Sequence, residues 1–394
     1  MNDHQDLLNK MRNMTKELMD NGPQSATAVI QKALQDAGLA SASAARAKVS
    51  PVSPAQSTPV MRDLNAPPVA KHAATGLLSR LGAGVGAGVA KAHLTGAAVT
   101  IPDGAQFIAG SYANAAGTRQ YKLYIPSCYD GQPLPLVVML HGCTQDPDDF
   151  ARGTQMNAAA EQNRCLVLYP QQSNSANSSK CWNWFNANDQ QRNSGEPSIL
   201  AGMTREVAAR YKINPQQIYI AGLSAGGAMA AIMGTVYPDL YAGVGVHSGL
   251  PYGAATDLPS ALAAMRSGMA GVPSAATSSA GLPGFNGIPI IVFHGDADHT
   301  VNVRNGDQVM TSSARASADK SRQVRSQGRV AGGHAYTRTV QHDGSGDAVA
   351  EHWLVHGFGH AWAGGSPNGS FTDARGPDAT GEMMRFFYTH KNPA

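Results

Sequence analysis

The sequence is poor in charged residues and has no long apolar run. Only 14% of its 394 residues are Asp, Glu, Lys or Arg, and the formal net charge of +3 is spread thinly. Without a basic cluster we expect no nucleic-acid partner. The longest apolar run lies near "LPLVVML" at 134–140, far short of the roughly 18 residues that cross a bilayer. We therefore expect no transmembrane segment.

Cysteines are also few. The chain has Cys128, Cys143, Cys165 and Cys181, and no two of them form a C-x-x-C pair. This spacing argues against zinc and thioredoxin-like sites, and it leaves two, one or no disulfides open. The opening "MNDHQDLLNKMRNM" mixes both charge signs and lacks an apolar core, so a conventional signal peptide is not expected.

Composition divides the chain into three parts. Apolar residues at helical spacing predict a small helical hairpin over 1–39. Residues 40–104 are rich in Ala, Ser, Pro and Gly, which predicts a flexible linker. Regular structure is expected again over 105–390, which we interpret as a catalytic domain.

Strands and helices are expected to alternate in this third part, which predicts an α/β domain with a mostly parallel sheet flanked by helices. The predicted strands are 119–126, 134–140, 165–170, 217–223, 241–249, 288–295 and a strand pair over 335–357. The predicted helices are 148–163, 198–212 and 225–238.

Ser224 lies in "GLSAG", a match to G-x-S-x-G between a predicted strand and a predicted helix. Such a turn strains the serine backbone and projects its Oγ above the sheet. Side chains at 222 and 226 would collide with the strand and the helix, so glycine is expected there. A glycine-rich helix start with an incidental serine is the alternative interpretation.

A nucleophilic serine needs a base and an acid, which in this fold follow it in the order acid, histidine. Asp298 follows a predicted buried strand and is the expected acid, with Asp296 as second candidate. His360 lies in a glycine-rich loop beyond the last predicted strand and is the expected base, with His356 as second candidate.

The oxyanion of an acyl transfer needs two backbone N–H donors. One is expected from Ala225, directly after the serine. The other is expected from Cys143, in the loop after the predicted strand 134–140. His141 in the same loop is interpreted as a residue that packs and hydrogen-bonds to hold it.

Several longer blocks resemble, in family order, the esterase family that includes short-chain polyhydroxyalkanoate (polyhydroxybutyrate) depolymerases. They are "LPLVVMLHGCTQDPDDFARGTQMNAAAEQ", "KCWNWF", "GEPSILAGMTREV", "YIAGLSAGGAMAAIMGTVYPDLYAGVGVHSGLPYGAA", "HGDADHTVNVRNGD" and "GFGHAWAGG". The resemblance covers about 105–390. It implies an α/β-hydrolase fold, ester hydrolysis, and the serine, acid and base roles at Ser224, Asp298 and His360.

The expected substrate is an ester, and the first candidate is polyhydroxybutyrate-type polyester or its oligomers. Relatives that resemble feruloyl and acetylxylan esterases keep acylated plant polysaccharide as an alternative, and an acyltransferase on the same fold is another. A polymer-binding protein with an idle serine is the non-enzymatic alternative. The chemistry needs no metal or cofactor, and the oligomeric state stays open.

Trp362, Trp182 and Trp184 stand out in a chain with only 6% aromatic residues. We consider two interpretations, walls of a substrate cleft or core packing. A Cys143–Cys181 disulfide that would stiffen the oxyanion loop is weighed against two free thiols. The family resemblance implies work on extracellular polymers, whereas the opening residues favour the cytoplasm or an unconventional exit, so the compartment stays open.

Overall fold

The computed structural model describes residues 99, 101–268, 287–314 and 322–393. The chain divides into units 1–93 and 94–394, and every described residue belongs to the second. The hairpin predicted at 1–39 and nearly all of the predicted linker lie outside the described residues. Within the described part, no helix is both long and apolar enough to cross a bilayer.

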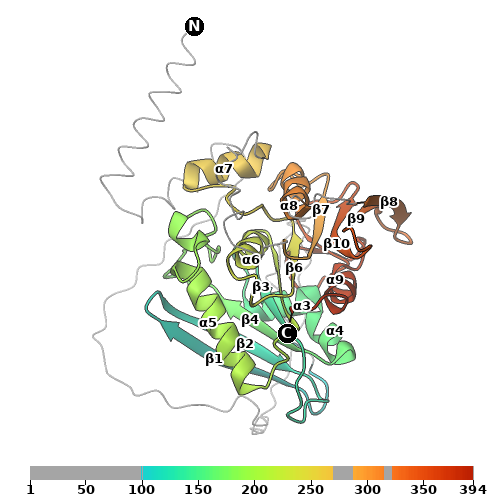
Figure 1. Ribbon diagram of the computed structural model, residues 1–394. Coiled ribbons are helices and arrows are strands. Elements are labelled where there is room, and N and C mark those ends of the chain that lie inside the picture. Colours follow the sequence, from blue (N-terminus) through green and yellow to red (C-terminus); the bar gives the residue numbers. More distant parts are fainter. Residues whose placement is uncertain (1–98, 100, 269–286, 315–321, 394) are drawn as a thin grey trace, which may run out of the picture. The chain divides into compact units, whose positions relative to one another are not determined.

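Strands and helices alternate through most of this unit (Figure 1). The strands are β1 Gln106–Asn114, β2 Gly117–Ile125, β3 Leu136–Leu140, β4 Leu166–Gln171, β5 Ile218–Leu223, β6 Gly243–His247, β7 Ile290–Gly295, β8 Arg322–Arg329, β9 Ala335–His342, β10 Ala348–Val355, β11 Trp362–Ala363 and β12 Thr372–Asp373. The helices are α3 Pro147–Thr154, α4 Met156–Asn163, α5 Gly195–Arg210, α6 Ala225–Val236, α7 Leu258–Ser267, α8 Arg304–Ala314 and α9 Ala379–Tyr388, with a 3-10 turn η1 at Ala187–Gln190.

The main sheet of the described residues has ten strands in the order β1-β2-β4-β3-β5-β6-β7-β10-β9-β8. The six strands from β4 to β10 pair in parallel, whereas β1, β2, β9 and β8 pair antiparallel. The predicted mostly parallel sheet is therefore confirmed. Because the carboxyl ends of parallel strands share one edge, the loops after β3, β5, β6, β7 and β10 meet there.

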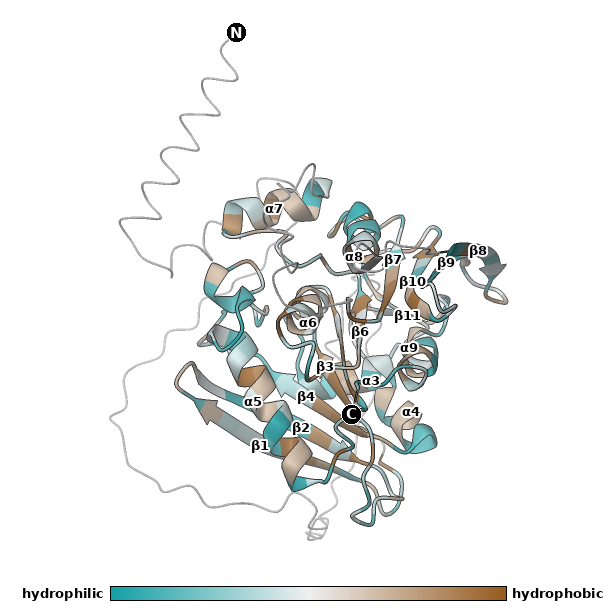
Figure 2. Ribbon diagram, in the orientation of Figure 1, coloured by the Kyte–Doolittle hydropathy of each residue, from teal (hydrophilic) through white to brown (hydrophobic). Residues whose placement is uncertain are grey.

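Helices cover both faces of the sheet, as Figure 1 shows. Residues of α5 and α6 pack with Val138 and Ile220 into one core, and residues of α3, α4 and α9 pack with Val137 and Tyr219 into another. The alternation along β3 and β5 thus sends successive apolar side chains to opposite faces. The central strands are strongly hydrophobic, and the outer strand β8 is hydrophilic (Figure 2).

The predicted helix 148–163 is two helices. Gln155 between α3 and α4 has a φ of 55°, and its N–H caps the Ala151 carbonyl. The antiparallel strands β1 and β8 and the helices α7, α8 and α9 were not predicted. The strand β8 is exposed along most of its length, so it shows no apolar alternation that would reveal it.

Candidate active site

Ser224 occupies a strained turn between β5 and α6. Its φ of 57° and ψ of −120° lie in a region that L-residues rarely adopt. Its N–H donates to the His247 carbonyl on β6 at 2.9 Å, which fixes the turn against the neighbouring strand. The predicted strand-to-helix turn with a strained serine is confirmed.

Glycines on either side of the serine let three backbone segments approach one another. A Cβ at Gly226 would overlap the carbonyl oxygens of Leu140 and His141. A Cβ at Gly222 would overlap the main chain of Gly226. These glycines therefore provide room for the backbone, as the sequence pattern indicates.

Asp298 and His360 form a hydrogen-bonded pair at the same edge of the sheet. His360 Nδ1 lies 2.7 Å from Asp298 Oδ2. Asp298 Oδ1 accepts from the N–H groups of Thr300 at 2.8 Å and Val301 at 2.9 Å. The carboxylate is fully buried, and the imidazole keeps 12% of its side chain exposed. The Nδ1 edge of the His360 ring is thus held by the carboxylate, while part of the ring is still exposed at the surface.

The pKa of Asp298 is held below its ordinary value. Burial raises the pKa of this carboxyl, but hydrogen bonds from His294 and His360, the charge of His360 and the Val301 N–H outweigh that effect. The carboxylate is therefore ionised at neutral pH. It can orient the His360 ring and stabilise its cation.

The loops after β7 and β10 pack directly against each other, which brings this pair together. The Ala297 N–H donates to the Phe358 carbonyl at 3.1 Å. A Cβ at Gly295 would overlap that same carbonyl. Glycine at 295 thus permits the contact between the acid loop and the histidine loop.

The second candidates, Asp296 and His356, bind each other. His356 Nδ1 lies 2.8 Å from Asp296 Oδ2, and its Nε2 lies 2.9 Å from the Thr337 hydroxyl. Both ring nitrogens are engaged with partners other than Ser224. This pairing favours Asp298 and His360 as acid and base.

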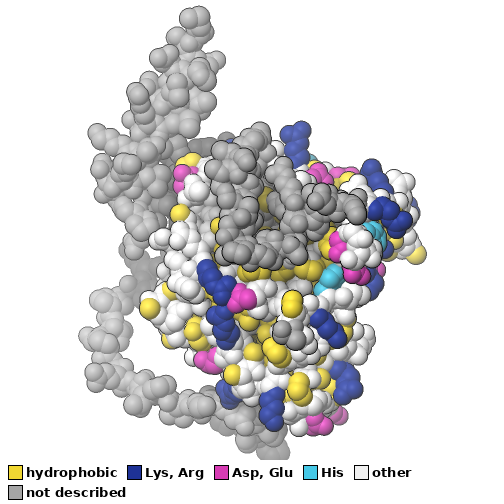
Figure 3. Space-filling model, viewed as in Figure 1, with side chains coloured by type: hydrophobic (Ala, Val, Ile, Leu, Met, Phe, Trp, Pro, Cys, Tyr) yellow, Lys and Arg dark blue, Asp and Glu magenta, His cyan; other side chains and the backbone are white. Residues whose placement is uncertain are grey.

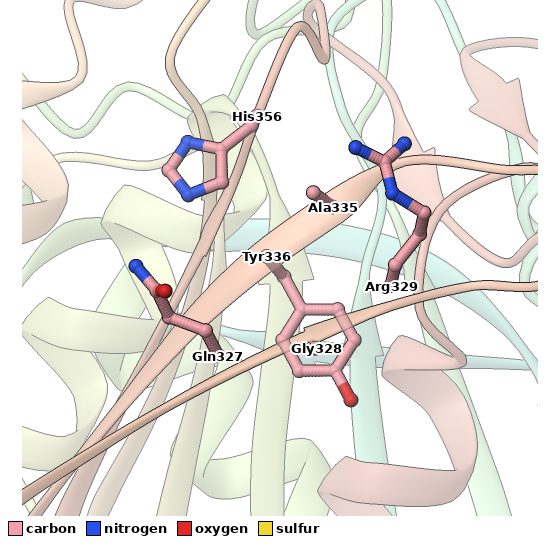
Figure 4. Close-up of a pocket in the computed structure, with 6 residues that line it drawn as sticks. All are labelled: Gln327, Gly328, Arg329, Ala335, Tyr336 and His356. Atoms are coloured by element: carbon pink, nitrogen blue, oxygen red, sulfur yellow. The ribbon is translucent and has the colours of Figure 1, made fainter.

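A surface pocket of about 400 Å³ adjoins His356. Figure 4 shows the side chains of Gln327, Arg329 and His356 around it, with the Tyr336 ring across Gly328. On the face in Figure 3, basic side chains gather over β8 next to a histidine. The lining of this pocket includes neither Ser224 nor His360.

The loop after β3 lies against the serine. A Cβ at Gly142 would lie 3.6 Å from Ser224 Cβ. The Gly142 N–H donates to Gln145 Oε1 at 2.9 Å, whereas the Cys143 N–H has no acceptor within the described residues. The Cys143 N–H is therefore the donor of this pair that is left for a ligand.

A disulfide joins Cys143 to Cys181, with a Cα–Cα distance of 4.2 Å. Beside it, His141 is buried, lies 2.8 Å from the Gly142 carbonyl through Nδ1, and accepts the Gln172 N–H at Nε2. Burial lowers the pKa of His141 to about 4, so the ring is neutral at pH 7. The bridge and this ring hold the loop after β3, and the interpretation of His141 as a residue that packs and hydrogen-bonds to hold this loop is confirmed.

The tryptophans lie in the core. Trp362, Trp182 and Trp184 are 1%, 0% and 5% exposed. Trp362 donates to the Thr380 hydroxyl, and Trp182 donates to the His141 carbonyl. As placed, the three rings present almost no surface to a ligand, which favours core packing over the walls of a substrate cleft.

A polar cluster joins the loop after β3 to the chain beyond His360. Gln145, only 2% exposed, donates through Nε2 to Asp149 Oδ2 at 3.0 Å and to the Ser370 carbonyl at 3.2 Å. The Ser370 N–H donates to Asp149 Oδ1 at 2.9 Å. Gln145 is not predictable from the sequence, because an isolated polar residue after a loop has no local pattern that marks it.

Among the described residues no group of three His, Cys, Asp or Glu side chains is arranged to hold a metal ion. The arrangement that does exist is a strained serine, a buried carboxylate–imidazole pair and a free loop N–H at one edge of the sheet. These are the parts that nucleophilic acyl transfer requires.

Comparison with known proteins places the chain in a family. Residues 119–327 match the family model described as esterase PHB depolymerase. The chain is 35% identical over 206 residues to poly(3-hydroxyalkanoate) depolymerase C of Paucimonas lemoignei, across 51% of this chain and 49% of that protein. It is 28% identical over 193 residues to a probable acetylxylan esterase A of Aspergillus clavatus, across 46% of this chain and 61% of that protein. The chain thus spans about half the length of the first of these relatives.

Among solved structures, an acetyl xylan esterase from Aspergillus awamori superposes with a TM-score of 0.52 at 19% identity. The match covers 65% of this chain and 93% of that one. At this identity the likeness concerns the fold, which is the α/β-hydrolase fold. Because the family model matches more than half of the sequence, the chain belongs to the esterase PHB depolymerase family.

Proposed function

We propose that the protein is a serine esterase that hydrolyses carboxylic esters with Ser224, Asp298 and His360. The observation that carries this proposal is the 2.7 Å contact between His360 Nδ1 and the buried Asp298 carboxylate, at the sheet edge where Ser224 occupies its strained turn. The family membership and the esterase names of the relatives support it.

The first half of the reaction forms an acyl-enzyme. His360 takes the proton of Ser224, and the serine oxygen attacks the ester carbonyl carbon. The tetrahedral intermediate collapses, the carbon–oxygen bond to the alcohol breaks, and His360 returns the proton to the leaving alcohol. In the second half, water attacks the acyl group, His360 accepts a proton from that water, and Ser224 leaves with the proton as the acid is released.

The negative charge that develops on the carbonyl oxygen is stabilised by the N–H groups of Cys143 and Ala225. The Cys143 N–H has no other acceptor among the described residues, and Ala225 begins α6, whose dipole favours an anion. The disulfide and the His141 hydrogen bonds stiffen the loop that carries the first donor. Every step uses groups of this chain alone.

The proposed substrate is polyhydroxybutyrate-type polyester or its oligomers. Its support is that the relative with 35% identity is named a poly(3-hydroxyalkanoate) depolymerase. The second candidate is an acetyl or feruloyl ester of a plant polysaccharide, which the acetylxylan and feruloyl esterase names of more distant relatives favour.

The test compares wild type with Ser224→Ala and with Ser198→Ala, a serine on α5. The expected result is a loss of kcat by several orders of magnitude in the Ser224 variant alone, with Tm retained. A fluorophosphonate probe should label wild type and the Ser198 variant only. Retained turnover in the Ser224 variant would refute the assignment.

The substrate is tested on a panel of polyhydroxybutyrate, its soluble oligomers, feruloyl esters and acetylated xylan. The highest kcat/KM on the hydroxybutyrate oligomers supports the first candidate, and the highest on a carbohydrate ester supports the second. A competing alcohol separates hydrolysis from transfer, since an acyltransferase would form a new ester.

A further inference from the structure

His247 is a buried histidine at the end of β6 that the proposed reaction does not use. It is 0% exposed and lies between the strands that precede Ser224 and Asp298. Its register partners are Leu223 on β5 and Phe293 on β7. A histidine at this depth needs an explanation, because burial of a polar ring without partners is costly.

The backbone of His247 holds the nucleophile turn. Its carbonyl accepts the Ser224 N–H at 2.9 Å, so the strained serine is fastened to this residue. The next N–H, of Ser248, donates to the Phe293 carbonyl at 2.8 Å. The same short segment is therefore joined to the strand that leads to Asp298.

The side chain of His247 holds the loop that carries His360. Its Nε2 lies 2.9 Å from the Ala363 backbone nitrogen and accepts that N–H. Ala363 is three residues beyond His360. His247 thus contacts the Ser224 turn through its carbonyl and the His360 loop through its imidazole. It also pairs with β7, the strand that leads to Asp298.

The imidazole must be neutral to make this contact. Because Nε2 accepts, the ring proton is on Nδ1, which lies 3.2 Å from the Ser248 hydroxyl. Burial, with the nearby His294 and His360, holds the pKa of His247 well below its usual range. The His247 ring also stacks on two aromatic rings, with its centroid 5.1 Å from that of Trp362 and 5.7 Å from that of Phe293.

We infer that His247 is a positioning residue, whose Nε2 acceptor sets the distance between the His360 loop and the Ser224 turn. The inference rests on the proposed function, since it concerns the same serine and histidine. It also explains why Trp362 is buried, since that ring stacks on His247 and fixes its orientation.

Packing alone is the competing explanation, and two substitutions separate it from positioning. His247→Phe keeps a flat ring for stacking but has no acceptor. His247→Gln places an amide oxygen near the position of Nε2 but has no ring. Positioning predicts the larger loss of kcat for His247→Phe, and packing predicts the larger loss of kcat for His247→Gln.

The measurement is kcat and KM on a soluble p-nitrophenyl ester, together with Tm, for the two variants and wild type. We expect His247→Phe to lower kcat by about 10²-fold with little change in KM, because small misplacements of a base have effects of this size. His247→Gln should recover much of that kcat despite a lower Tm.

His390→Phe is the matched control. His390 also binds backbone, with Nε2 2.7 Å from the Ala348 carbonyl, but at the end of α9. It should lose Tm without losing kcat. If His247→Phe keeps wild-type kcat, or if the kcat of His247→Gln falls below that of His247→Phe, the inference is overturned. Ser224→Ala in the same series separates failure of this inference from failure of the proposed function. If the Ser224→Ala variant stayed active, the proposed function would be overturned.

Discussion

Replacement of Asp298 by asparagine tests the acid at the level of single hydrogen bonds. Asp298 Oδ1 accepts from the N–H groups of Thr300 and Val301, whereas Oδ2 faces His360 Nδ1 at 2.7 Å and His294 Nε2 at 3.5 Å. An amide has only one oxygen. It must therefore turn its NH₂ group either toward the two backbone donors or toward the imidazole.

The two backbone N–H donors favour one of these orientations. An NH₂ group facing these donors would leave the part-buried Thr300 N–H and the buried Val301 N–H without an acceptor, and the buried one alone costs about 1–3 kcal/mol. The amide oxygen is thus expected to stay with the backbone, and the NH₂ group then donates to His360 Nδ1. That moves the ring proton to Nε2, so the imidazole can no longer accept the proton of Ser224.

We expect Asp298→Asn to lower kcat by about 10³-fold to 10⁴-fold, which corresponds to about 4–5.5 kcal/mol in the barrier. The assay is hydrolysis of p-nitrophenyl butyrate by purified protein, with Tm as a check on folding. Asp296→Asn is the control, because that carboxylate lies on the same loop but pairs with His356. If Asp298→Asn retained more than about a tenth of kcat, or both variants lost equally, the tautomer argument would fail.

Three further predictions concern the stability of the site. Gly226→Ala should cost more than about 3 kcal/mol in the free energy of unfolding, because its Cβ would overlap two main-chain carbonyls, whereas Gly359→Ala, where a Cβ meets open space, should change Tm little. Equal Tm values would contradict this. Replacing Cys143 and Cys181 by serine should lower stability by about 2–4 kcal/mol in urea unfolding and lower kcat as well; an unchanged midpoint would argue against the bridge. His352 is 6% exposed, and burial lowers its pKa to about 4. Below pH 6.5 the unfolded chain therefore binds more protons at this residue than the folded chain does. The contribution of His352 to the free energy of unfolding should fall by about 2–3 kcal/mol from pH 7 to 4.5. His352→Leu should remove this part of the pH dependence, and an identical slope in both proteins would refute it.

The sequence pattern predicted the central sheet because its strands are continuous apolar runs. "LPLVVML" and "QIYIAGL" correspond to β3 and β5, since strands buried on both faces carry no polar alternation. The Ser224 turn was predictable for a related reason, because its glycines mark a close backbone approach. The roles of Ser224, Asp298 and His360 stay predictions until they are tested in solution.

Other parts of the site had no local signal. Gln145 contacts Ser370, 225 residues further along the chain, and such a contact exists only once the sheet has formed. His247 belongs to a predicted strand, but its role depends on a backbone N–H at Ala363. The tryptophans were ambiguous because a large ring suits a core and a cleft equally well, and only their burial distinguishes the two.

The hydrogen bonds between Gln145, Asp149 and Ser370 bear on how much chain this site requires. The family match ends at residue 327, yet His360 and Ser370 lie beyond it. A protein truncated shortly after His360 would still carry Ser224, Asp298 and the histidine, but the loop after β3 would lose its hydrogen bonds to Ser370. Minimal expression boundaries, and swaps of C-terminal segments between homologues, therefore have to include Ser370 as well as α9, whose residues pack into the core.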